Sequence, residues 1–154
     1  MNAKAPLSMR RPRLLIVGCG DVGLRVLRLL RGRWHVTALT SSPERRAALR
    51  AAGAVPLLGD LDRPTTLARL AGVADAVLHL APPPSHGTRD PRTLALLRAL
   101  ARGAIQRLVY ASTSGVYGDC GGAWVRETRA PRPLTDRAHR RVDAEASVRA
   151  FARA

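Results

Sequence analysis

Aromatic residues are scarce in this chain of 154 residues, since Trp, Tyr and Phe together make up 3% of it. Its hydrophobic core must therefore be built from Leu, Val and Ala. Lysine is also nearly absent, because Lys4 is the only one, so the formal net charge of +15 comes almost entirely from arginine. The arginines are spread over every segment, without the interleaved aromatics of a nucleic-acid surface. We interpret them as solvated side chains on helix faces, and we do not expect a nucleic-acid partner.

Cysteine is limited to Cys19 and Cys120, which form no C-x-x-C pair and no cluster with metal-ligand spacing. Two free thiols are typical of a reducing cytoplasm, and no metal site is predicted. Apolar runs long enough to cross a bilayer are missing as well. The basic N-terminus leads straight into a glycine motif, which argues against a signal peptide. We predict a cytoplasmic protein with no membrane segment, a disordered leader over 1–10 and one domain over 11–154.

A glycine motif dominates what the sequence does contain. The apolar run 14–17, typical of a buried strand, is followed by G-x-G-x-x-G at 18–23 and then by a helical pattern. In such a unit Gly18 permits a sharp turn, Gly20 leaves room for a pyrophosphate, and Gly23 lets the helix pack closely. The helix N-terminus offers N–H groups to the phosphates. The motif predicts dinucleotide binding, and a plain strand-to-helix turn is the alternative.

Strand and helix patterns alternate along the whole chain. Strands are predicted at 14–17, 34–40, 55–60, 74–81 and 107–111, and helices at 22–30, 43–52, 64–70, 90–103 and 135–154. In the first helix the apolar positions Val22, Val26 and Leu29 recur at helical spacing. The alternation predicts an α/β fold with a doubly wound parallel sheet of about five strands and helices on both faces. Right-handed crossovers place the first and fourth strands side by side, and Pro56 places the third strand at an edge.

The end of the second predicted strand indicates which cofactor is bound. An acidic residue here would bind the ribose 2′-hydroxyl of NAD, but the sequence has Thr40, Ser41 and Ser42, followed by Arg45. The missing carboxylate and the arginine suit a 2′-phosphate, so the prediction is NADP, with NAD as the alternative. Arg45 can equally be an exposed residue of the next helix.

Residues at the ends of the third and fourth predicted strands lie at the same edge of the sheet. We expect Asp60, Leu61 and Asp62 near the adenine, and for Asp62 we favour the alternative that it caps the helix 64–70. His79, inside the fourth strand, is interpreted as a core histidine with a hydrogen-bond partner. The loop histidine His86 has no assigned role.

Four segments together carry a resemblance to a known family: 14–23, 60–62, 78–82 and 112–119. The chain resembles the N-terminal half of an extended or atypical short-chain dehydrogenase/reductase of the NAD(P)-dependent epimerase/dehydratase type. The resemblance implies a Rossmann fold and an oxidoreductase or nucleotide-sugar epimerase or dehydratase, acting on a small molecule such as a sugar nucleotide. It puts Thr113 at the catalytic serine/threonine position between Ser112 and Ser114, and Tyr117 is a candidate proton donor.

The sequence departs from the family pattern at the catalytic helix. When Glu145 is matched to that helix's usual acidic residue, the tyrosine and lysine positions hold Arg137 and Arg141. Arg141 can still hold the ribose, whereas Arg137 cannot act as an acid because a guanidinium keeps its proton. Two hypotheses follow: an NADP(H)-dependent enzyme that is weak or inactive in this short form, or a non-catalytic NAD(P)-binding sensor or regulatory module.

The resemblance also implies that the C-terminal substrate region is absent, so the open edge of the sheet is a candidate surface for a homodimer. The predicted cofactor contacts are Gly18, Cys19, Gly20, Asp21, Val22, Gly23, Thr40, Ser41, Ser42, Arg45, Asp60, Leu61, Leu80, Ala81, Pro82 and Arg141.

Overall fold

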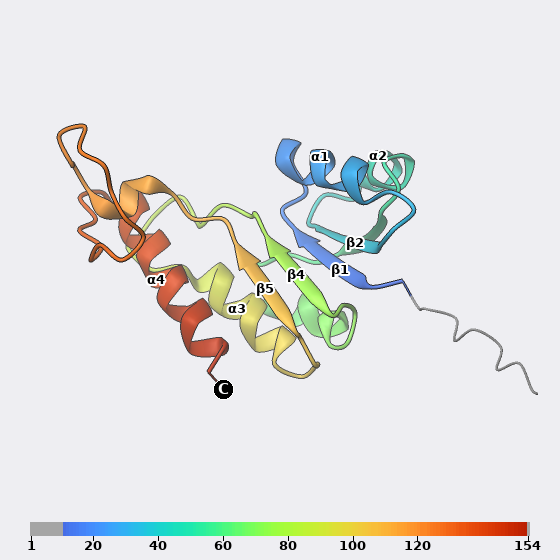
Figure 1. Cartoon of the computed structure of the whole chain (residues 1–154). Coiled ribbons are helices and arrows are strands. Elements are labelled where there is room, and N and C mark those ends of the chain that lie inside the picture. The colour runs from blue at the N-terminus through green and yellow to red at the C-terminus, as the bar shows by residue number, and fades with distance from the viewer. Residues whose placement is uncertain (1–10, 154) are drawn as a thin grey trace, which may run out of the picture.

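A single parallel sheet organises the chain in the computed structural model, which describes residues 11–153. Its five strands lie in the order β3-β2-β1-β4-β5, and all neighbours are parallel (Figure 1). The strands are β1 (Arg13–Val17), β2 (His35–Thr40), β3 (Val55–Leu58), β4 (Ala76–His79) and β5 (Arg107–Tyr110). The predicted Rossmann-like fold is confirmed, including the pairing of the first and fourth strands and the edge position of Pro56. The leader predicted over 1–10 lies outside the described residues.

Helices cover both faces of the sheet. The α-helices are α1 (Asp21–Leu30), α2 (Arg45–Ala51), α3 (Pro91–Leu100) and α4 (Asp136–Phe151). Two short 3-10 helices, η1 (Pro64–Leu70) and η2 (Ser114–Tyr117), follow β3 and β5. Helices α1 and α2 lie on one face, and α3, α4 and η1 lie on the other (Figure 1). None of the helices within residues 11–153 combines the length and the hydropathy needed to cross a membrane.

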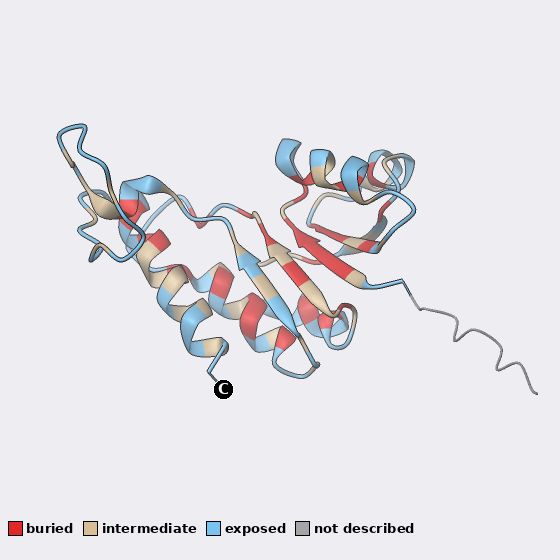
Figure 2. Cartoon of the chain, in the orientation of Figure 1, coloured by how far each residue is buried: buried red, intermediate tan, exposed pale blue. Residues whose placement is uncertain are grey.

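The core forms two layers because alternate side chains of β1 point to opposite faces. Leu15 and Val17 pack in the cluster that includes Leu96 of α3, while Ile16 packs with Leu27 of α1. Leu15, Ile16 and Leu96 are completely buried, and most of the strand β1 is coloured as buried in Figure 2. Complete burial of one such aliphatic side chain contributes about 2 kcal/mol. These layers hold β1 rigidly, and so they fix the loop that follows it.

Only part of the apolar stripe predicted for α1 faces the core: Val26 packs against it, whereas Val22 and Leu29 do not. Val22 and Leu29 are 58% and 75% exposed, and the buried positions are Gly23 and Leu27. A Cβ on Gly23 would lie 3.0 Å from the Sγ of Cys19 and 3.4 Å from a methyl carbon of Ile16. The helix therefore meets the sheet through its glycine, which a pattern of large apolar residues does not reveal.

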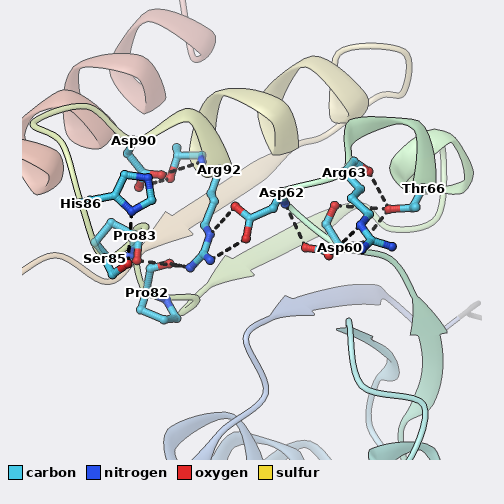
Figure 3. Close-up of polar contacts among 11 residues, drawn as sticks. Asp60, Asp62, Arg63, Thr66, Pro82, Pro83, Ser85, His86, Asp90 and Arg92 are labelled. Carbon is cyan, nitrogen blue, oxygen red and sulfur yellow. Dashed lines mark hydrogen bonds and ion pairs between the residues drawn. The ribbon is translucent and has the colours of Figure 1, made fainter.

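The segment 64–70 is a 3-10 helix, and the predicted cap by Asp62 is wrong. Arg63 is its N-cap residue, and no side-chain cap hydrogen bond is formed. Instead the Asp62 carboxylate binds the guanidinium of Arg92, with distances of 2.8 Å to Nε and 2.6 Å to Nη2 (Figure 3). Two charge-assisted hydrogen bonds stabilise the carboxylate more than one bond from a backbone amide would.

Candidate functional site

The glycine loop between β1 and α1 has one crowded and one open glycine. Gly18 has φ +84°, and a Cβ there would lie 2.5 Å from the Cα of Ala81, so the loop packs against the chain leaving β4. Gly20 donates its N–H to the carbonyl of Gly18 at 2.9 Å, and a Cβ on Gly20 would meet nothing within 4 Å. Helix α1 begins directly afterwards at Asp21, without a side-chain cap. The open space therefore lies at an uncapped helix N-terminus, where an anion is favoured.

A pocket of about 340 Å³ adjoins this loop at the carboxyl ends of the strands. Its lining residues are Val17, Gly18, Cys19, Leu39, Thr40, Ser41, Arg45, Gly59, Asp60, Leu61, Asp62, Ala81, Pro82 and Arg92. Parallel α/β sheets bind ligands at this edge, next to the point where the strand order reverses. Nine of the predicted cofactor residues come together here: Gly18, Cys19, Thr40, Ser41, Arg45, Asp60, Leu61, Ala81 and Pro82.

Other predicted cofactor residues do not line the pocket. Gly20, Asp21, Val22 and Gly23 continue the loop into α1, and Leu80 directly precedes two lining residues. Ser42 donates its hydroxyl to the carboxylate of Glu44, and this hydrogen bond lowers the pKa of Glu44.

Arg141 lies against β5, away from the pocket lining. Its side chain is buried, and its Nη1 donates to the Tyr110 hydroxyl and to the carbonyl of Ala111, both at 2.9 Å. Its guanidinium carbon lies 5.5 Å from the centre of the Tyr110 ring. Burial raises the pKa of Tyr110, and the hydrogen bond from Arg141 opposes that shift. Arg141 therefore secures the end of β5 in this structure, and its Nε is buried without a hydrogen-bond partner.

Arg45 reaches from the start of α2 to the glycine loop. Its Nη2 donates to the carbonyl of Cys19 at 2.6 Å. The Cys19 thiol is buried, and burial raises its pKa although the charge of Arg45 opposes that shift. One arginine thus brings positive charge to the wall shared by Thr40, Ser41 and the glycine loop.

The hydroxyl groups predicted to be catalytic cluster after β5 and do not line the pocket. Ser112 donates to the carboxylate of Glu145 on α4 at 2.5 Å, and the Oγ1 of Thr113 accepts from the N–H of Gly115 at 3.3 Å. Ser114 is exposed, and Tyr117 is partly buried at the end of η2. Arg137, at the tyrosine position of the family, is exposed on α4. Helix α4 thus reaches the hydroxyl cluster through Glu145.

A buried polar network connects β4 with α3. The Nε2 of His79 lies 2.9 Å from the Oγ1 of Thr93, which donates to the carboxylate of Asp90 at 2.8 Å. The three side chains are 2% exposed or less, and the Nδ1 of His79 has no hydrogen-bond partner. Burial lowers the pKa of His79 from 6.5 to about 4; the charge of Asp90 opposes this shift and that of Arg141 adds to it. His79 is a core histidine as predicted, but only one of its ring nitrogens is paired.

Helix α4 holds the loop that leaves β4. The Nη1 of Arg140 donates to the carbonyl of Gly87 at 2.5 Å, and the carboxylate of Asp143 accepts from the N–H of Asp90 at 2.8 Å. The loop also contains three consecutive prolines, at 82–84. Both contacts come from α4, so this helix holds the loop that leaves β4 in a defined position.

Arg92 is the main site residue that sequence reasoning missed, together with its pairing to Asp62. Arg92 lies in the first turn of α3, and Asp62 lies 30 positions earlier in the chain. No motif links the two positions, so the sequence contains no signal for their pairing. Val17 and Leu39 also line the pocket, and their places at or near the ends of predicted strands were such a signal. Within residues 11–153 no group of three His, Cys, Asp or Glu side chains is arranged to hold a metal ion.

Solved structures similar to this chain are about twice its length. A conserved protein of unknown function from Silicibacter pomeroyi is 34% identical with a TM-score of 0.72, over 91% of this chain and 49% of its own. A short-chain dehydrogenase/reductase superfamily protein from Agrobacterium tumefaciens, solved with bound NAD, is 25% identical with a TM-score of 0.75, over 92% of this chain and 45% of its own.

A UDP-glucuronic acid 4-epimerase from Bacillus cereus, in complex with UDP-glucuronic acid and NAD, has a TM-score of 0.73 at 22% identity. The match covers 92% of this chain and 52% of the epimerase, and it shows a shared fold. No curated protein is detectably similar to the chain in sequence. The model of a family described as NAD(P)H-binding matches residues 18–151, from the first glycine of the loop to the end of α4. The chain belongs to this NAD(P)H-binding family.

Proposed function

We propose that the chain binds NADP(H) at the 18–23 loop and forms the dinucleotide-binding part of an NAD(P)-dependent oxidoreductase or nucleotide-sugar epimerase/dehydratase-like protein. The observation that carries the proposal is the open space beside Gly20, at the start of α1 and next to a pocket of about 340 Å³. Of the glycines whose φ lies outside the left-handed region in residues 11–153, only Gly20 would place a Cβ in empty space. The protein itself would accommodate a side chain at this position, so a glycine here is typical of a site where a ligand approaches the backbone closely.

The Arg45 side of the pocket suits a phosphorylated ligand; the two carboxylates that also line the pocket belong to Asp60 and Asp62, and Asp62 is paired with Arg92. Arg45 lies on one wall, and the N-terminus of α1 lies close to another. The chain from Thr40 to Ser42 supplies hydroxyl groups, and its nearest acidic residue, Glu44, is bound to Ser42 and does not line the pocket. A ribose 2′-phosphate needs positive charge where a free 2′-hydroxyl needs a carboxylate. These observations favour NADP over NAD.

Catalysis in the proposed enzyme would come from the hydroxyl cluster after β5. A nicotinamide cofactor supplies hydride exchange when bound. Ser112, Thr113 and Ser114 would then bind and orient a small-molecule substrate, with Tyr117 as the candidate proton donor. The Bacillus cereus epimerase holds a sugar nucleotide, which supports that class of substrate here. Because Arg137 cannot give up a proton and Arg141 is occupied by Tyr110 and Ala111, we expect little or no turnover from this chain alone.

A second function is a non-catalytic NAD(P)-binding sensor or regulatory module. The two arginines at the tyrosine and lysine positions favour it, because one is exposed and the other is buried against β5. Both functions share the same dinucleotide site. They differ in whether binding leads to turnover.

The decisive experiment is a fluorescence titration with NADPH and NADH, followed by the same titration of Gly20→Val. The substitution fills the space that a pyrophosphate needs, so binding should weaken by at least about 100-fold while the unfolding temperature changes little. Gly115→Val is the matched control, because a Cβ there has only ordinary contacts at 3.7 Å and the position does not line the pocket.

If the wild-type chain binds neither dinucleotide, or if Gly20→Val binds as tightly as wild type, the proposal is wrong. An assay of cofactor oxidation and reduction with UDP-sugars then separates the two functions. Turnover supports the enzyme, and tight binding without turnover supports the sensor.

A further inference from the structure

We infer that the Arg92 guanidinium, clamped by Asp62, forms a flat wall on which the adenine ring of the dinucleotide stacks. The inference rests on the proposed function and adds to it the residue that recognises the adenine half of the ligand. Arg92 comes from the first turn of α3 and Asp62 from the chain after β3, so the pair connects two segments across the edge of the sheet (Figure 3).

Four hydrogen bonds fix the plane of the Arg92 guanidinium. Its Nε and Nη2 donate to the two carboxylate oxygens of Asp62 at 2.8 and 2.6 Å. Its Nη1 donates to the carbonyls of Pro82 and Pro83, both at 3.3 Å. A guanidinium has five N–H donors, all in its plane, so a single one remains free. A ligand in the pocket therefore meets mainly the flat face of this group.

The ion pair also separates two hollows. Asp62 and Arg92 line the 340 Å³ pocket, and both line a second pocket of about 490 Å³ bounded by the 84–91 loop. The pair therefore lies at the border between the two pockets. The Arg92 side chain is 27% exposed, which is consistent with a group open to a hollow but held at its edges.

The pocket side of this wall suits a flat heteroaromatic ring. Leu61 and Pro82 line the same pocket and offer apolar contact. Asp60 lies beside them, and a carboxylate can accept a hydrogen bond from an exocyclic amine. A cation held against a ring face is attracted by the ring's quadrupole, and the attraction increases when water is excluded. Adenine is the ring of the proposed ligand that is flat and uncharged in both the oxidised and the reduced form, and its expected neighbours Asp60 and Leu61 line the same pocket as Arg92, so it is the part that this wall fits.

Asp62 acts as a positioning residue in this arrangement. Its carboxylate fixes the orientation of the guanidinium without touching the ring. The pairing is strong enough to shift both groups: the hydrogen bond from Arg92 lowers the pKa of Asp62, and the same bond raises the pKa of Arg92. Loss of Asp62 should therefore weaken stacking by freeing the guanidinium to rotate.

The test compares Arg92→Lys with Arg92→Met, titrated with NADPH and with adenosine 2′,5′-bisphosphate at low and high salt. Lysine keeps the charge but has no plane, so stacking predicts that both variants weaken binding by about 3- to 20-fold, equally at the two salt concentrations. Asp62→Asn keeps the side-chain volume and should lose less, about 2- to 5-fold. Arg98→Met removes an exposed arginine from the same helix and is the matched control, with unchanged affinity expected.

Full affinity in Arg92→Lys with a salt-sensitive loss in Arg92→Met would overturn the inference, because it would show a charge contact with phosphate. Full affinity in both variants would overturn it as well. Circular dichroism checks that each variant is folded, and if an Arg92 variant is not, Asp62→Asn decides: unchanged affinity refutes the inference. Failure of the proposed function is distinguishable, since the wild-type chain would then bind neither ligand.

Discussion

Because the imidazole of His79 is buried, we predict that the stability of the fold decreases as the pH is lowered. Burial lowers the pKa of His79 from 6.5 to about 4. Between these values the unfolded chain binds a proton that the folded chain does not, so stability must fall as the pH is lowered through this window. The full shift of the His79 pKa corresponds to roughly 3 kcal/mol in the free energy of unfolding. This contribution is present above pH 6.5 and is lost progressively as the pH falls toward 4.

The groups around His79 explain why it stays neutral in the fold. Thr93 donates its hydroxyl proton to Asp90, so its oxygen accepts from the Nε2–H of His79 and the unpaired Nδ1 carries no proton. A second proton would have to enter on Nδ1, which is buried without an acceptor. The Tyr110 ring lies 5.2 Å from the imidazole, and Arg141 behind it adds positive charge, which further disfavours protonation.

The measurement is urea unfolding of wild type and His79→Gln at intervals from pH 8 to pH 4.5, followed by far-UV circular dichroism. Glutamine can still donate to Thr93 but does not titrate, and subtracting its curve removes the contribution of the carboxylates common to both proteins. The stability difference in favour of wild type should shrink by roughly 2 to 3 kcal/mol over this range. A difference that stays constant with pH would refute the assignment of a neutral, buried His79. The NMR signal of the His79 ring provides a second check, since it should not titrate above about pH 5.

Three further predictions follow from single residues. Gly18→Ala should lower the free energy of unfolding by more than about 2 kcal/mol, because φ is +84° and the added carbon would overlap the backbone of Ala81. Gly20→Val should leave the thermal unfolding midpoint within a few degrees of wild type. Equal destabilisation of the two variants would contradict this difference between the two glycines. Arg45→Ala should reduce the preference for NADPH over NADH by about 10- to 100-fold in competitive titration, and an unchanged ratio would remove it from the 2′-phosphate site. Thr135→Ala should lower the free energy of unfolding by about 1 kcal/mol in urea, because the Thr135 hydroxyl caps α4 by accepting from the N–H of Ala138 at 3.2 Å. Thr135→Ser keeps the hydroxyl and should therefore lose less stability.

The positions of the strands could be predicted from the sequence because buried parallel strands are almost continuously apolar. Only their ends shift: the strand predicted over 74–81 is Ala76–His79, and the one over 34–40 is His35–Thr40. The pairing of the first and fourth strands was predicted from the handedness of the connections, which is a property of the chain backbone rather than of particular side chains. The complete order of the five strands comes from the structure.

The buried faces of the helices were harder to predict. In α3, Leu94 stands three positions before the buried Leu97 but is 40% exposed, while the polar Thr93 is completely buried. Thr93 is inside because its hydroxyl binds Asp90 and its oxygen meets His79. A tertiary hydrogen-bond network of this kind decides which residues of a helix are buried, and the local sequence pattern does not predict it.

Some residues of the candidate site could likewise be predicted from the sequence, whereas others could not. The glycine loop, the end of β2 and Asp60 are found by spacing, because each follows a strand whose end lies at one edge. The pair of Asp62 and Arg92 depends on two segments that only the fold brings together, and the same is true of the hydrogen bond from Arg141 to Tyr110. Long-range pairs of charged and polar groups are therefore the part of the site that requires coordinates.

The two borders of the sheet are chemically unequal. On the β3 side, Pro56 lacks a main-chain donor, and a proline in a strand is tolerated only where no further strand has to pair with that donor. On the β5 side, the strand 107–110 carries no proline, and Val109 is 51% exposed. Additional strands, whether from a longer polypeptide or from another molecule, are thus admitted at one border and discouraged at the other. The sheet can therefore be extended beyond β5, on the side of the hydroxyl cluster, and not beyond β3.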